Sequence, residues 1–133
     1  MIGPLLKGLK ITLREFFNPA ITLRYPEEKR EPYPRWRGLH HLEWDEERNR
    51  EKCVACRLCS TVCPSQCITV VPGEDEKHEM YPVEYTIDEL RCIFCGFCVE
   101  ACPVNAIIQR TTYEIAGESR ESMIYTKEML LKT

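Results

Sequence analysis

Eight of the nine cysteines in this chain of 133 residues form two copies of one pattern, and this restricts the fold more than any other feature. Each copy reads C-x2-C-x2-C-x3-C-P, and the second begins 39 residues after the first. The copies comprise Cys53, Cys56, Cys59, Cys63 and Pro64, and Cys92, Cys95, Cys98, Cys102 and Pro103. Neither copy is large enough to bury its own interior, so the two are expected to pack together with pseudo-twofold symmetry.

The compartment decides how so many cysteines are interpreted. In a secreted chain they would suggest disulfide bonds, but Lys7, Lys10, Arg14 and Glu15 interrupt the opening 17 residues. This segment therefore lacks the unbroken apolar stretch of a signal peptide or a spanning helix. A reducing, cytoplasmic setting follows, where clustered cysteines are metal ligands or redox groups. The net charge of −3 comes without a large basic patch, which argues against nucleic acid as a partner.

The cysteine spacing favours two [4Fe-4S] clusters. It is the known run of bacterial ferredoxins, in which three thiolates surround one cluster and the fourth binds the other. The proline disfavours helical geometry at the cysteine before it and helps to turn that cysteine away. The spacing assigns one cluster to Cys53, Cys56, Cys59 and Cys102, and the other to Cys92, Cys95, Cys98 and Cys63.

Zinc sites and disulfides are the alternatives to iron-sulfur clusters. Zinc sites need four ligands, commonly in two separated pairs, whereas here six cysteines form two triplets and two more precede prolines. The ninth cysteine, Cys67, has Ala106 as its counterpart in the second copy. It is expected to be a small buried residue beside a cluster rather than a ligand or a redox switch.

Sequence patterns around the cysteines predict a small α+β domain. Runs rich in β-forming residues predict strands at 68–71, 81–87 and 106–112, and a short helical turn is expected ahead of each Cys-Pro. The fold class is a bacterial-type 2[4Fe-4S] ferredoxin domain with additional N-terminal segments. The expected organisation is an amphipathic helix at 1–18, an extended docking arm at 19–50, the ferredoxin domain at 51–116 and a C-terminal helical tail at 117–133.

The N-terminal segment is expected to form an amphipathic helix from about Pro4 to Phe17. Its apolar side chains recur at helical spacing, namely Leu5, Leu6, Leu9, Leu13, Phe16 and Phe17. Because the clusters are expected to fill the cysteine-rich block, the apolar stripe is predicted to dock on a membrane surface or a partner. Packing on the protein's own core is the alternative.

The following arm is expected to be extended. Three prolines prevent a regular helix between Arg24 and Leu42, and aromatic and arginine side chains of the kinds enriched at interfaces are frequent there. These side chains are Tyr25, Tyr33 and Trp36, with Arg30, Arg35 and Arg37, and Trp44 follows shortly after the segment. A partner surface is therefore predicted, with an arm folded back over its own domain as the alternative. His40 and His41 are expected to be ordinary hydrogen-bonded surface histidines, because neighbours in an extended segment point in opposite directions.

The two copies differ in charge. Arg57 stands where the second copy has Gly96, and Thr61 stands where it has Glu100. A positive charge favours the reduced, more negative state of a cluster. The cluster held by Cys53, Cys56 and Cys59 is therefore expected to have the higher potential.

Three stretches together resemble a known family: YPEEKREPYPRWRG at 25–38, EKCVACRLCSTVCPSQCI at 51–68 and RCIFCGFCVEACPVNAI at 91–107. They closely resemble the ferredoxin-like subunit I of proton-pumping NADH:quinone oxidoreductase, respiratory complex I. The resemblance implies that the family's eight cluster ligands are the eight cysteines assigned above. It also implies that the chain relays electrons and has no catalytic side chains, since the redox chemistry belongs to the clusters.

The resemblance further implies a peripheral position near the membrane, on the cytoplasmic side of the cell inner membrane. Electrons would arrive from the NADH side, cross both clusters and leave for a terminal cluster in a neighbouring subunit that reduces quinone. The N-terminal helix would lie along a membrane subunit, and the arm would contact partner subunits. The alternatives are a free soluble ferredoxin, which leaves the first fifty residues without a purpose, and the equivalent subunit of a related membrane-bound hydrogenase or dehydrogenase.

Overall fold

The structure, a computed structural model, describes residues 2–132, so Met1 and Thr133 at the ends of the first and last expected segments lie outside it. The chain divides into two units, Met1–Glu31 and Pro32–Thr133. The first contains helix α1 (Ile2–Phe16), with Pro4 in its first turn, where a missing N–H costs nothing. This helix begins two residues before the expected start at Pro4 and ends one residue before the expected end at Phe17. Among the described residues, no helix has the length and apolar character needed to cross a membrane.

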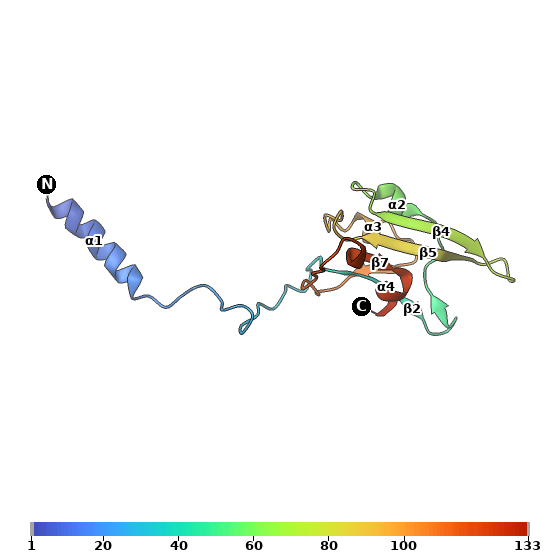
Figure 1. The fold of residues 1–133 in the computed structure, drawn as a ribbon, viewed down its shortest axis with the longest axis horizontal. Coiled ribbons are helices and arrows are strands. Elements are labelled where there is room, and N and C mark those ends of the chain that lie inside the picture. The colour runs from blue at the N-terminus through green and yellow to red at the C-terminus, as the bar shows by residue number, and fades with distance from the viewer. Residues whose placement is uncertain (1, 133) are drawn as a thin grey trace. The chain divides into compact units, whose positions relative to one another are not determined.

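Within residues 32–132, the second unit contains three small antiparallel sheets (Figure 1). The largest has the order β4-β5-β7, and the other two are the pairs β1-β6 and β2-β3. The strands are β1 (His40–Leu42), β2 (Trp44–Asp45), β3 (Arg50–Glu51), β4 (Ile68–Glu74), β5 (Met80–Asp88), β6 (Ile107–Gln109) and β7 (Ile124–Thr126). The helices are α2 (Leu58–Val62), α3 (Phe97–Glu100), the 3-10 turn η1 (Glu121–Met123) and α4 (Lys127–Lys132). The three predicted strands and both predicted helical turns are present.

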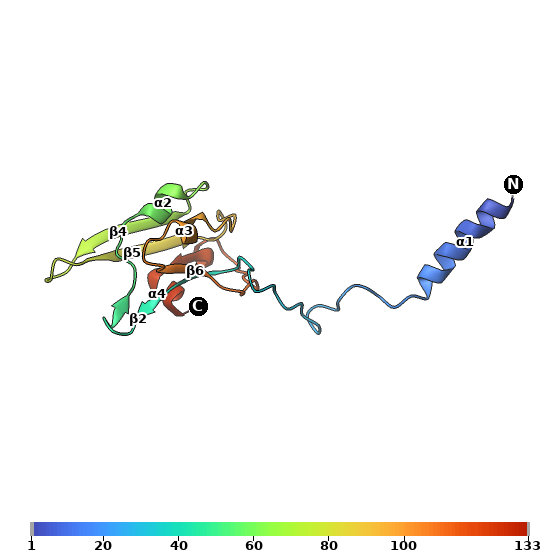
Figure 2. The same cartoon turned by 180° about the vertical axis from the view of Figure 1, so that it is seen from behind.

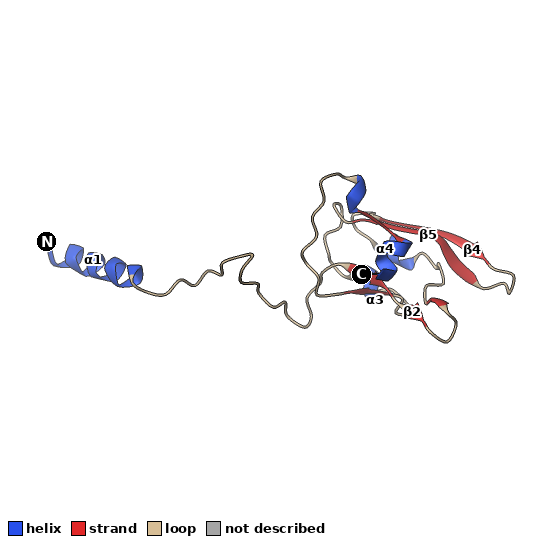
Figure 3. Cartoon of the chain, turned by 60° about the horizontal axis from the view of Figure 1, so that its bottom comes forward, coloured by secondary structure: helices blue, strands red, loops and turns tan. Residues whose placement is uncertain are grey.

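The apolar core lies between the sheets and the cysteine loops. Its most deeply buried side chains are Leu42 on β1, Tyr85 and Ile87 on β5, and Leu130 on α4. Helix α4 packs against β1, and Figure 3 shows it beside β5 as well. In the reverse view of Figure 2, β6 lies between α3 and α4. Helix α4 thus covers the side of the core that β1 forms.

The structure qualifies the expected boundaries of the arm and the tail. The predicted arm reaches residue 50, but β1 within it pairs with β6, with His41 opposite Ile108 and Leu42 opposite Ile107. The predicted helical tail includes strand β7, which extends the sheet along β5. Strands β1 and β7 are too short to show a clear alternation in the sequence. Only their pairing with distant strands identifies them.

The prediction for the two histidines was wrong in their exposure. His40 and His41 are buried, with 1% and 8% of their surfaces exposed. They lie on β1 between β6 and α4 rather than on an open arm. The sequence pattern alone does not show that β6 and α4 cover the two histidines, because these elements lie more than sixty positions later in the chain.

Candidate metal centres

The two cysteine runs follow the same backbone path. Two positions in each run and one just after it have positive φ angles, which side-chain-bearing residues rarely adopt. The matching pairs, 39 residues apart, are Ala55 (49°) and Phe94 (52°), Arg57 (63°) and Gly96 (82°), and Gln66 (49°) and Asn105 (49°). Alternation between right- and left-handed conformations turns successive N–H groups towards one side, which suits a negatively charged group.

The N–H groups of these loops point at cysteine sulfurs in the same pattern in both copies. The N–H of Phe94 donates to Sγ of Cys92 at 3.3 Å, and the N–H of Ala106 donates to Sγ of Cys102 at 3.2 Å. In the first copy, the equivalent donors are the N–H groups of Ala55, to Cys53, and of Cys67, to Cys63. Such hydrogen bonds stabilise negative charge on sulfur, as metal-bound thiolates require.

Four of the predicted ligands line one cavity. Cys53, Cys56 and Cys59 from the first run and Cys102 from the second surround this cavity. The remaining wall is largely apolar and includes Leu42, Val70, Tyr85, Val104 and Ile107. Soft sulfur donors in an apolar enclosure suit an iron-sulfur cluster well. The structure thus brings together the four cysteines that the spacing assigned to one cluster.

Two of the other predicted ligands, Cys63 and Cys92, lie beside Cys67. Sγ of Cys63 lies 3.5 Å from Sγ of Cys67, and the thiol of Cys67 interacts in turn with Cys92. Helix α3, which carries Cys98, packs against α2, which carries Cys59 of the first group, so the two groups of cysteines adjoin. The predicted burial of Cys67 is confirmed, since only 6% of its surface is exposed.

Burial opposes ionisation of several of these thiols. It raises the pKa of Cys53 to about 11 and the pKa values of Cys92 and Cys98 to about 12. At neutral pH these thiols hold their protons, and metal binding must release them because the thiolate is the ligand. The negative charge left on the sulfurs is then compensated by metal and by the N–H groups described above.

Tyr85 on β5 is a buried polar contact that the sequence did not single out. Its hydroxyl donates a hydrogen bond to Sγ of Cys59 at 3.4 Å, and only 1% of the residue is exposed. Burial and then the nearby Cys59 raise the pKa of Tyr85 well above its usual value. Tyr85 therefore stays a neutral donor. Nothing in the sequence indicated that Cys59 is its partner.

A buried histidine-glutamate pair lies behind Cys92. Nδ1 of His40 is 2.9 Å from Oε1 of Glu89, and the imidazole ring stacks on Phe94 with the centroids 5.7 Å apart. Donor atoms of His40, Glu89 and Cys92 all lie within 4.8 Å of one another. Because Cys92 is assigned to a cluster, the pair is a polar support behind that ligand rather than a separate metal site. Sequence reasoning missed Glu89; its one signal was its position three residues before the cysteine run.

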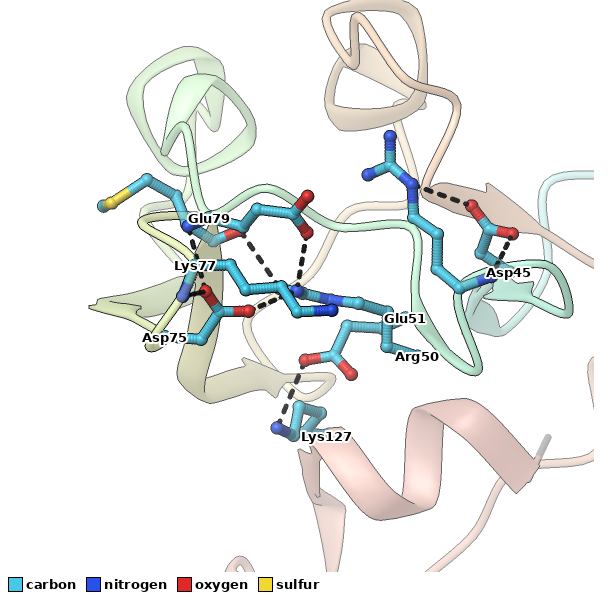
Figure 4. Close-up of polar contacts among 9 residues, drawn as sticks. Asp45, Arg50, Glu51, Asp75, Lys77, Glu79 and Lys127 are labelled. Atoms are coloured by element: carbon cyan, nitrogen blue, oxygen red, sulfur yellow. Dashed lines mark hydrogen bonds and ion pairs between the residues drawn. The ribbon is translucent and has the colours of Figure 1, made fainter.

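A surface cleft lined by charged residues lies elsewhere. Figure 4 shows Arg50 between two carboxylates, with Nη1 2.9 Å from Asp75 and 3.0 Å from Glu79. Lys127 on α4 contacts Glu51 on β3, with Nζ 3.4 Å from Oε1. These charges satisfy one another across β3, the β4–β5 turn and α4. The ion pairs in this cleft therefore hold these elements together. The cysteine loops remain the candidate site.

Comparisons with known proteins agree with this location. Residues 52–106 match the family of 4Fe-4S dicluster domains. The chain is 52% identical over 132 residues to NADH-quinone oxidoreductase subunit I 2 of Geobacter metallireducens, covering 99% of both chains. It is 53% identical over 132 residues to subunit I 1 of Geobacter sulfurreducens, covering 99% of this chain and 98% of that one.

A solved structure is also similar. It is a chain from the membrane-bound sulfane sulfur reductase, an archaeal respiratory membrane complex, with a TM-score of 0.61 and 32% sequence identity. The match covers 85% of the present chain and 56% of that chain. The similarity therefore extends beyond the cysteine block, and the other chain is considerably longer.

Proposed function

The chain belongs to the NADH-quinone oxidoreductase subunit I family, and on this premise we propose the route that electrons take through it. Membership makes it an electron-transfer subunit of a multi-subunit oxidoreductase and a carrier of iron-sulfur clusters. We propose two [4Fe-4S] clusters, bound by the two groups of four cysteines assigned from the spacing. The observation that carries this proposal is the cavity lined jointly by Cys53, Cys56, Cys59 and Cys102.

The side chains around the two groups hold and insulate the clusters rather than react. When bound, such clusters accept and release single electrons. Leu42, Val70 and Ile107 exclude water from the first group, and the loop N–H groups stabilise its charge. Helices α2 and α3, which carry Cys59 and Cys98, pack against each other, and this supports direct transfer between adjacent clusters. No residue of this chain needs to act as an acid, base or nucleophile.

The N-terminal segments supply the docking surface in this proposal. Ile2, Leu5, Leu9, Leu13 and Phe16 are spaced to share one face of α1, and none of the described residues of this helix is buried. That face would lie on a membrane subunit at the cytoplasmic side of the inner membrane. The exposed aromatic side chains of the arm, such as Tyr33 and Trp36, would contact the subunit that holds the terminal cluster.

Affinity isolation of the tagged chain from native membranes tests the docking proposal. Leu9→Glu places a charge in the apolar stripe, whereas Ile11→Glu makes the same kind of change about 160° away on the helix. Leu9→Glu should reduce both the co-purifying subunits and NADH-driven quinone reduction, and Ile11→Glu should reduce neither. Unchanged assembly of the Leu9→Glu chain would show that the stripe is not a docking surface.

The similarity to the sulfane sulfur reductase chain supports one alternative, a subunit of a related membrane-bound reductase. Identities of 52% and 53% across whole chains favour the NADH-quinone oxidoreductase. The same isolation separates the two, since only one of them brings down an NADH-oxidising subunit. A free soluble ferredoxin would bring down no membrane subunit at all.

A further inference from the structure

The loop that carries Cys95 lacks a side chain that the equivalent loop of the first run has. Arg57 and Gly96 occupy matching positions, each immediately before a short helix and each with a positive φ, of 63° and 82°. A Cβ added to Gly96 would lie 3.0 Å from Nε and 3.1 Å from Cζ of Arg37. The space left by Gly96 is thus filled by the guanidinium of an arm residue.

Arg37 is held against this loop by its own contacts. Its Nη1 donates a hydrogen bond to the carbonyl oxygen of Cys95, one of the predicted ligands. Its Nη2 lies 3.4 Å from Oε1 of Glu100 on α3. The guanidinium therefore bridges the cysteine loop and the helix that follows it.

The neighbouring backbone fixes where Arg37 can reach. The N–H of Gly38 donates to the carbonyl oxygen of Arg110 at 3.0 Å, and the N–H of Leu39 donates to that of Thr112 at 2.8 Å. An added Cβ at Gly38 would come within 3 Å of both carbonyl oxygens, so only glycine allows this close approach. The arm is therefore fastened to the end of β6 immediately after Arg37.

We propose that Arg37 is the cation of the second cluster's binding loop, where it takes the place that Arg57 has in the first loop and raises the reduction potential of that cluster. This inference rests on the proposed pair of clusters. A guanidinium beside the loop stabilises the reduced state, which carries one more negative charge. The expectation that the first cluster has the higher potential considered only charged residues within the two cysteine runs. Arg37 adds a positive charge from outside the runs.

Two features limit the size of the effect. Glu100 places a negative charge 3.4 Å from the guanidinium, and about half of the Arg37 side chain is exposed, so solvent and salt screen its charge. Removing the charge should weaken reduction of the second cluster by about threefold to tenfold in its equilibrium constant, tenfold being about 59 mV for one electron. Removing the opposing charge of Glu100 should act in the other direction.

Potentiometric titration of the full chain with reconstituted clusters, followed by EPR, tests the proposal. Arg37→Gln should lower the potential of one of the two signals and leave the other unchanged, and Arg57→Gln should do the reverse. Arg37→Lys should retain most of the wild-type potential, because the charge remains. Arg35→Gln is the matched control, since it removes the same charge from the same segment and should shift neither signal.

Several outcomes would overturn the proposal. An unchanged potential in loaded Arg37→Gln protein would do so, as would an equal shift of both signals or the same shift in Arg35→Gln. The double variant Arg37→Gln/Glu100→Gln is a second arm if Arg37→Gln loads poorly: a lower potential of the second signal than in Glu100→Gln supports the proposal, and an equal one contradicts it. A wild-type chain that forms no [4Fe-4S] signals would instead refute the proposed function.

Discussion

The hydroxyl of Tyr85 should raise the potential of the first cluster, and Tyr85→Phe removes only this group. The hydroxyl donates to Sγ of Cys59 at 3.4 Å in a site where 1% of Tyr85 is exposed. A hydrogen bond to sulfur strengthens as negative charge builds on it, so it favours the reduced cluster. Phenylalanine keeps the ring and its packing, and its smaller size leaves no large cavity.

The magnitude follows from the charge dependence of such a bond. A hydrogen bond to a charged group contributes about 1.5–3 kcal/mol, of which only a part differs between the two redox states. If that part is about 0.5–1.5 kcal/mol, the potential of the first cluster falls by about 20–65 mV in Tyr85→Phe. The second cluster should be unaffected, because the hydroxyl points at Cys59.

Potentiometric EPR titration of the full chain measures both potentials in one sample. Tyr81→Phe is the matched control: it removes a hydroxyl from the same strand, where the ring faces Arg50 and Lys127 rather than a cysteine. A shift in Tyr85→Phe alone supports the reasoning. Equal potentials in wild type and Tyr85→Phe would refute it, and so would an equal change in Tyr81→Phe.

Four further predictions concern stability. Leu130→Ala should destabilise the loaded protein by about 2–5 kcal/mol in chemical denaturation, because the side chain is completely buried under β1. Arg50→Ala should cost less, about 1–2 kcal/mol, and lose its effect at high salt, because its two carboxylate partners are partly exposed. Burial and then Arg110 lower the pKa of His41. As the pH falls below about 6.5, the unfolded chain therefore takes up a proton at this position before the folded chain does, and stability is lost. His41→Gln should reduce this loss of stability between about pH 7 and 5, measured by denaturation at several pH values. Removal of iron should abolish cooperative thermal unfolding, followed by circular dichroism, since a core this small depends on its clusters.

The elements predicted correctly are those with local causes. The repeated cysteine spacing gave the helical turns at α2 and α3, and β-rich composition gave β4, β5 and β6. The grouping of Cys102 with the first run also came from the motif, through the proline that follows it. These features need no knowledge of distant residues, because a few neighbouring positions determine the backbone conformation.

The features missed depend on partners far away in the chain. Strand β1 has three residues and forms only because β6 lies beside it. The burial of His40 requires that pairing, and its partner Glu89 comes from a third segment. Gly38 did carry a usable signal, since a glycine between bulky neighbours often marks a close backbone approach. The sequence did not say which backbone approaches it.

Strand β1 also changes where a docking arm can be separated from the electron-transfer domain. Residues 32–42 lie in the second unit, and their last part forms hydrogen bonds with the chain after β6. Removal of 1–44 would therefore take away Arg37, His40 and Leu42, and the loss of function would not distinguish docking from damage to the clusters. Removal of 1–31 leaves these side chains in place. If the chain without residues 1–31 fails to assemble but keeps both cluster signals, docking belongs to the first unit. If it instead loses the signal of the second cluster, residues 1–31 also support that cluster.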